Sequence, residues 1–260
     1  RQSENLTVLA GLHFNLGDTA RAEDASRGAV ELAEPHGATT ALARAYRGQA
    51  TLRMLQRDVD DAVSWGLRAA ELAERLGDDL TLGQALNATG SAWMMTDVDR
   101  GRAALQRSRE LAIARGEHAN AANAYANLGS ALGEVWQVAA ADRGLAEGIA
   151  FCAERDLDAQ RGYMLAWRAV AAVRLGRLTE AAQWAEEALR PLRVGTITKI
   201  MALLAQGLLR VRRGDPGAQQ RARRGARARA AHRHVAACRP GARGPGRGCL
   251  AVRRRGGCPT

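Results

Sequence analysis

The sequence predicts an all-α fold, a right-handed superhelix of antiparallel helix pairs with a period of about 40 residues. A fixed period of this length is typical of repeat proteins, in which each unit buries its apolar face against its neighbours. A small residue recurs in steps of 40, 40, 39, 40 and 38, at Ala10, Ala50, Gly90, Gly129, Ala169 and Gly207. A larger apolar residue stands four positions before each, at Leu6, Tyr46, Leu86, Tyr125, Leu165 and Leu203.

A second set of small residues marks the second helix of each predicted pair. They follow the first set by about 12 and 19 positions, as at Ala22 and Ala29 or at Ala62 and Ala69. Separations of four and seven residues share one face of a helix. We therefore expect the small residues to let two helix backbones approach, while the larger ones fill the groove beside them.

Turn residues place the ends of the predicted helices. The turns within pairs are expected near Gly17-Asp18, Arg57-Asp58, Thr96-Asp97, Trp136 and Gly176, and a sixth is expected at Gly214. Asp18 is a plausible N-cap, because its carboxylate can accept a free N–H of the following helix. Pro35, Gly37, Gly77 and Pro191 are expected to end second helices, since proline and glycine interrupt helical backbone.

Composition agrees with close-packed helices in a reducing compartment. The chain has 260 residues, of which 47% are hydrophobic and only 4% aromatic. It has no apolar run of membrane-spanning length and no signal-peptide layout, so we expect a cytoplasmic protein without a membrane partner. The four cysteines do not resemble a disulfide framework. Because the first residue is Arg1, we expect a fragment or a processed chain.

The positive charge is confined to one end of the sequence. The whole chain has 38 basic and 27 acidic residues, but residues 216–260 contain 12 arginines and no acidic residue. That leaves 26 basic against 27 acidic residues in 1–215. We therefore divide the chain into a helical-repeat domain, 1–218, and an Arg/Gly/Pro-rich tail, 219–260.

Two interpretations of the tail stay open. One is a disordered basic arm, which would bind nucleic acid weakly and in a salt-dependent manner. The other is a slipped reading frame. With GC-rich codons, a one-base shift can turn residues 248–258 into Ala-Ala-Trp-Leu-Ser-Gly-Asp-Ala-Glu-Ala, whose Gly lies 39 residues after Gly214 and so on the repeat period.

The repeats resemble the tetratricopeptide-like region of bacterial LuxR-type, MalT-like transcriptional regulators that carry an ATP-binding domain. The resemblance lies in ERDLD at 154–158, LAWRA at 165–169, LGR at 175–177, EAA at 180–182 and LLRVRRGDPGA at 208–218. It implies a nucleotide-binding domain before these repeats and a helix-turn-helix after them. This sequence has no G-x-x-x-x-G-K-[ST] phosphate loop, so it would be the regulatory middle region.

Candidate binding residues lie on the predicted first helices. Asn120, Asn123 and Asn127 have the spacing of one helical face, and Gln84, Asn87 and Ser91 form a similar stripe one repeat earlier. The resemblance implies that first helices line the concave surface, where amides can bind a peptide backbone or sugar hydroxyls. Further candidates for this surface are Arg44, Arg47, Trp93, Trp167 and Arg168. The alternative is that all are solvated or packing residues.

No pattern indicates catalysis, a cofactor or a metal. His13, His36 and His118 have no nucleophile near them in sequence, and Cys152 is expected to be a packed core thiol. His232, His234 and Cys238 have spacing too loose for a zinc site.

The leading prediction is therefore a non-catalytic, effector- or protein-binding region of a LuxR-type regulator. Its partner would be a protein or small-molecule effector on the concave face, and DNA would be bound only by a domain outside this sequence. A general tetratricopeptide-type scaffold is the alternative, and nucleic-acid binding through the basic tail is the second alternative. No particular oligomeric state or effector is predicted.

Overall fold

The computed structural model describes residues 1–192 and 194–215. These residues form α-helices joined by short turns, together with one 3-10 helix, η1 (Glu34–His36), so the predicted all-α fold is confirmed. The helices are α1 (Gln2–Asn15), α2 (Thr19–Ala33), α3 (Thr40–Leu55), α4 (Val59–Leu76), α5 (Asp79–Trp93), α6 (Val98–Ala114), α7 (His118–Glu134), α8 (Val138–Ala153), α9 (Asp158–Arg174), α10 (Leu178–Leu189) and α11 (Thr196–Arg213).

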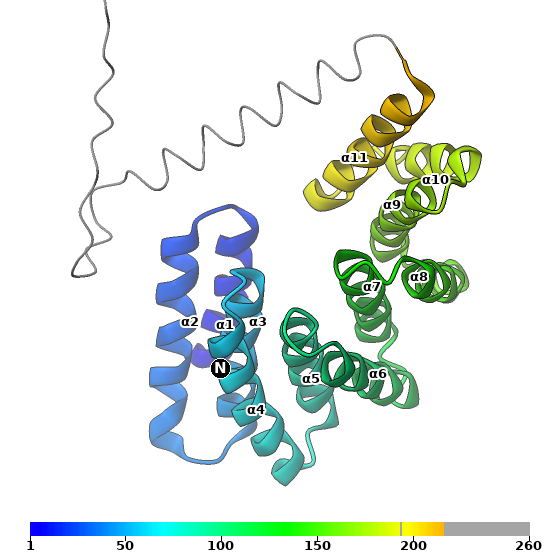
Figure 1. Ribbon diagram of the computed structural model, residues 1–260. Coiled ribbons are helices and arrows are strands. Elements are labelled where there is room, and N and C mark those ends of the chain that lie inside the picture. Colours follow the sequence, from blue (N-terminus) through cyan, green and yellow to red (C-terminus); the bar gives the residue numbers. More distant parts are fainter. Residues whose placement is uncertain (193, 216–260) are drawn as a thin grey trace, which may run out of the picture. The chain divides into compact units, whose positions relative to one another are not determined.

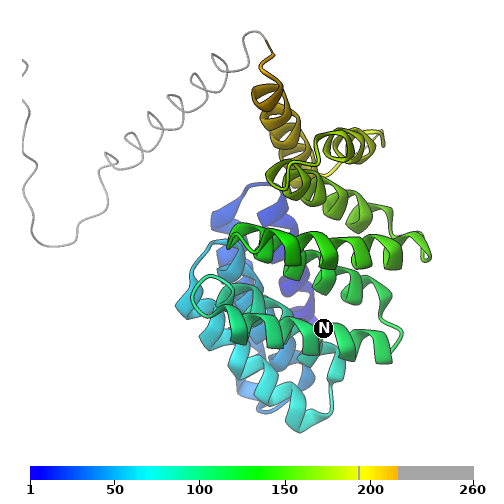
Figure 2. The same cartoon turned by 45° about the vertical axis from the view of Figure 1, so that its right-hand side comes forward.

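Successive helices pack as antiparallel pairs, from α1–α2 to α9–α10, and α11 follows α10 against α9 (Figure 1). Each odd-numbered helix also contacts the odd-numbered helix of the next pair, whereas even-numbered helices contact mainly the helices that precede and follow them in the chain. The odd-numbered helices therefore lie side by side on the inner side of the stack (Figures 1 and 2). They are the predicted first helices.

The recurring small residues lie where helices meet most closely. Ala50 and Ala169 are fully buried, and Gly90 on α5 faces Gly101 on α6. A Cβ atom on Gly101 would lie 2.6 Å from the backbone N of Met94 and 2.8 Å from the carbonyl O of Gly90. Interiors packed to this density have no room for a methyl group, so this crossing requires glycine on α6.

The predicted pattern fails in the sixth repeat. Gly207 is exposed, and a Cβ added to it would meet no atom within 4 Å. Leu203 is 49% exposed. In the earlier repeats this face packs against the second helix of the same pair, and the residues that follow α11 after 215 lie outside the described part of the chain. Instead, α11 packs on α9 and α10 through Ala202, Ala205 and Leu209.

The predicted turns are present, and side chains cap five consecutive helices. The carboxylate of Asp18 accepts from the N–H of Arg21 at 3.2 Å, and Asp58, Asp78 and Asp97 cap α4, α5 and α6 in the same way. The hydroxyl of Thr39 caps α3. The residues before α7, α8, α9 and α10 make no such bond.

Residues 1–213 form one compact unit, and the boundary predicted at 218 and the tail 219–260 lie outside the described residues. None of the helices in the described part of the chain is both long enough and apolar enough to cross a bilayer.

Candidate binding groove on the inner helices

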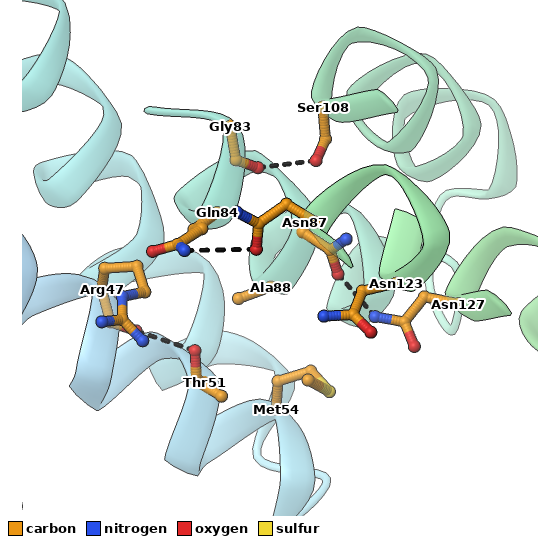
Figure 3. Close-up of a pocket in the computed structure, with 11 residues that line it drawn as sticks. Arg47, Thr51, Met54, Gly83, Gln84, Asn87, Ala88, Ser108, Asn123 and Asn127 are labelled. Atoms are coloured by element: carbon orange, nitrogen blue, oxygen red, sulfur yellow. Dashed lines mark hydrogen bonds between the residues drawn. The ribbon is translucent and has the colours of Figure 1, made fainter. Parts of the chain in front are cut away.

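Six of the predicted binding residues line one hollow of about 270 Å³ between α3, α5 and α7 (Figure 3). We call this hollow the amide groove, and the six are Arg47, Gln84, Asn87, Asn120, Asn123 and Asn127. The repeat explains why they meet: Arg47 and Asn87 stand at equivalent positions of their repeats, and Asn127 stands one position after the equivalent one on α7. Equivalent positions on adjacent first helices point into the same space.

Amide side chains bridge the helices on either side of the groove. The amide N–H of Gln84 donates to the side-chain oxygen of Asn120 at 3.3 Å, and Asn127 donates to that of Asn87 at 2.5 Å. Both bonds join α5 to α7, which contact each other less than any other adjacent pair of odd-numbered helices. Side-chain hydrogen bonds therefore link the two adjacent inner helices that have the least direct packing.

Arg47 is the one charged side chain among the described residues that line the amide groove. Its Nε atom is buried and has no hydrogen-bond partner. Burial, and to a smaller extent the charge of Arg44, lower the pKa of Arg47 below its usual value. Both causes disfavour the cation at this position, and the described lining of the groove contains no acidic residue that would stabilise it.

The other two predicted cationic residues form ion pairs outside the groove. Arg44 lies 2.5 Å from a carboxylate oxygen of Glu4 and 3.8 Å from one of Asp78, so it links α1, α3 and the start of α5. Arg168 on α9 lies 3.1 Å from Asp142 and stacks over the ring of Trp184 at 3.9 Å. Its side chain is thereby directed toward α8 and α10.

The remaining predicted residues also lie away from the groove lining. Ser91 donates to the carbonyl of Asn87 in its own helix at 2.8 Å. Trp93, at the end of α5, is stacked with Arg100. Trp167 is 8% exposed and belongs to the core between α7 and α9. It stands 40 residues after Asn127, so the column of groove positions ends in a buried aromatic ring.

A second hollow of about 670 Å³ adjoins the amide groove and shares Asn123 and Asn127 with it. We call it the apolar hollow after Phe14, Tyr163 and Ile197, which line it together with polar residues such as Asn15, Gln160 and Thr196; the described residues of its lining include no charged side chain. Burial raises the pKa of Tyr163, so this phenol stays neutral at physiological pH. Apart from Asn123 and Asn127, no sequence pattern indicated this hollow, because its residues come from α1, α7, α9 and the segment around the start of α11.

Thr51 and Met54 also line the amide groove and were not predicted. Thr51 stands 40 residues before Ser91, so the repeat period was the signal that marked it as an inner-face position. Met54 stands seven residues after Arg47, so helical spacing placed it on the same face of α3.

The described residues contain no group of three or more His, Cys, Asp or Glu side chains that could hold a metal ion. Cys152 is buried, and burial raises the pKa of its thiol, which suits the predicted core role. His232, His234 and Cys238 lie outside the described residues.

Comparison with known proteins supports the fold. No family model matches the sequence, and no curated protein matches it. One similar solved structure is the crystal structure of a STAND protein (signal transduction ATPase with numerous domains) with a tetratricopeptide repeat sensor, from Pyrococcus horikoshii. The match has a TM-score of 0.60 and 16% sequence identity over 85% of this chain.

The match spans 35% of the length of the Pyrococcus protein. This chain is therefore a tetratricopeptide-like helical-repeat region that resembles, in fold, a protein carrying a tetratricopeptide repeat sensor.

Proposed function

We propose that these repeats are the non-catalytic, effector-binding sensor region of a LuxR-type transcriptional regulator with an ATP-binding domain. The observation that carries the proposal is the amide groove at the α5–α7 joint, in a fold similar to that of a protein with a tetratricopeptide repeat sensor. The LuxR-type sequence pattern at 154–182 and 208–218 supports the more specific assignment.

The groove offers a physical route from binding to regulation. An effector between α3, α5 and α7 would compete for the amides that now bond Gln84 to Asn120 and Asn87 to Asn127. Because α5 and α7 have the least direct packing of the adjacent inner helices, exchanging these bonds for bonds to a ligand alters a large part of what joins the two helices directly. A ligand that binds more tightly at one helix spacing shifts the population of molecules toward the conformation with that spacing. Domains attached to the repeats would respond to this change.

The DNA that encodes and flanks this chain tests the assignment. We expect a phosphate-loop ATPase upstream and a helix-turn-helix downstream, with a one-base shift after residue 218 restoring an acidic helix. An intact frame flanked by neither domain would contradict the regulator and favour a general protein-binding scaffold. The DNA encoding 1–215 serves as the internal control, since its frame should be unbroken.

A further inference from the structure

The chemistry of the amide groove indicates what kind of ligand it would bind. Arg44 and Arg47 lie one turn apart on α3, but only Arg44 has carboxylate partners, Glu4 and Asp78. The described lining of the groove contains no acidic residue to neutralise Arg47. A guanidinium that is half-buried without a counter-charge is costly, and a negatively charged ligand would remove that cost.

The geometry of the donors also suits an oxyanion. A guanidinium presents its N–H donors as a planar fork, which matches carboxylate and phosphate oxygens. Around it, Gln84 and Asn127 each donate one N–H to a side-chain oxygen across the α5–α7 joint, and Asn120 and Asn87 accept. A primary amide has two such donors, so Gln84 and Asn127 each keep one for a ligand.

The apolar hollow extends the site beyond the charged end. It shares Asn123 and Asn127 with the amide groove, and its far wall includes Phe14, Tyr163 and Ile197. From the amide groove to the apolar hollow the lining thus changes from a cation, through amides, to aromatic and aliphatic groups that lie among uncharged polar side chains. A ligand that matches this order has an acidic group at one end and an apolar body.

We propose that the groove binds a small organic anion, with its carboxylate or phosphate on Arg47 and the amides and its apolar part in the apolar hollow. This names the ligand class of the effector-binding function proposed above and rests on that function.

Two homologous series of probes test the proposal by isothermal titration of the full chain. One is butyrate, hexanoate and octanoate, and the other is the corresponding alkyl phosphates; the uncharged alkyl amides serve as controls. Within each anionic series Kd should fall by about fourfold per added CH₂. At equal chain length, the Kd of the uncharged alkyl amides should be higher than that of the anions by about tenfold or more. The anionic series with the lower Kd indicates whether the ligand carries a carboxylate or a phosphate.

Matched variants localise the two ends of the ligand. Arg47→Gln should weaken the anions by about 10- to 100-fold, while Arg143→Gln, an exposed arginine on α8 outside both hollows, should not. Ile197→Asn should reduce the dependence of Kd on the length of the probe's alkyl chain. Its control is Ile200→Asn, because Ile200 is about as exposed, at 53% against 55%, but does not line the hollow. Circular dichroism of each variant checks that it is folded.

Three results would overturn the proposal. One is no binding by any anion of either series, and another is equal weakening by Arg47→Gln and Arg143→Gln, which would indicate non-specific attraction. The third is tight binding of the uncharged amides that Arg47→Gln leaves unchanged. That last result would leave an effector-binding groove in place, and the flanking DNA would still decide the regulator assignment separately.

Discussion

A side chain caps the start of every α-helix from α2 to α6, whereas no side chain caps α7, α8, α9 or α10. The part without caps, α7–α10, instead has a core rich in aromatic and sulfur-containing side chains. On α9, nine of the ten residues from Met164 to Val173 are buried, and Tyr125, Phe151 and Trp167 pack around Met164.

The difference shows that one repeat fold can position its helices in two ways. In α2–α6 local signals in the turns specify where each helix begins, at about 1 kcal/mol per cap. In α7–α10 the helix ends carry no such signal, and burial of large side chains must hold the helices. Three changes would break or sharpen this comparison.

The largest effect is expected where packing alone holds the helices. A Cβ on Gly148 of α8 would lie 2.5 Å from Sδ of Met164 and 2.8 Å from Cβ of Tyr125. Since the latter atom cannot move without α7, Gly148→Ala should reduce the free energy of unfolding by about 1–3 kcal/mol. Urea unfolding followed by circular dichroism measures the change.

The matched control lies one turn away on the same helix. A Cβ on Gly144 would meet no atom within 4 Å, so Gly144→Ala should stabilise by about 0.5–1 kcal/mol through helix propensity alone. Equal effects of the two variants would show that packing at Gly148 is less decisive than the geometry indicates.

Exchanging the capping pattern should have an intermediate effect. Asp97 accepts from the N–H of Arg100 at 3.1 Å, so Asp97→Ala should destabilise by about 1 kcal/mol, and Asp97→Asn, which keeps the cap, by much less. Glu117 precedes α7 with φ −80° and ψ 66°, close to the −89° and 76° of Asp78, but makes no cap bond.

Glu117→Asp should therefore install the missing cap and stabilise the chain by up to about 1 kcal/mol. Thermal unfolding of the four proteins in one buffer is the measurement. A stabilising Asp97→Ala, or a Glu117→Asp that destabilises, would contradict the contrast between the two parts.

The smallest effect is expected for the ion pair that joins the two parts. Arg57, in the turn between α3 and α4, donates two hydrogen bonds of 2.9 Å to Glu134 at the end of α7. Both side chains are at least 36% exposed, so their coupling in a double-mutant cycle with Arg57→Gln and Glu134→Gln should not exceed about 1 kcal/mol.

That coupling should weaken further in 1 M salt, because screening acts on exposed charges. A coupling of several kcal/mol that salt leaves unchanged would contradict this expectation. It would mean that this ion pair, rather than helix packing, holds α2–α6 and α7–α10 together.

The fold could be predicted because its information is periodic. Small residues such as Ala50, Gly90 and Gly129 fall on a fixed period and are buried, and the turns at Asp18, Asp58 and Asp97 carry their own capping chemistry. The error at Gly207 has the same origin. Periodicity specifies which face a residue occupies, but not whether a partner helix covers that face.

The binding groove was only partly predictable for a related reason. The amides of α5 and α7 could be placed on one surface, because neighbouring repeats align equivalent positions. The sequence could not distinguish Arg47 from Arg44, since the difference lies in whether Glu4 and Asp78, which are distant along the chain, reach the guanidinium. Nor could it show that Trp167, in the same column as Asn127, turns into the core.

The pattern of helix contacts also bears on how the protein folds as it is synthesised. Every substantial contact between helices of the described chain joins elements at most two places apart in helix order. Folds built from such local contacts form rapidly, and each pair can dock on the one before it as it leaves the ribosome. The bond between Arg57 and Glu134 spans 77 residues and can close only after α7 is complete. The amide bonds of the groove also need α7, so the amide groove is assembled with the fourth pair, whereas the apolar hollow is completed only when α9 and α11 have been made.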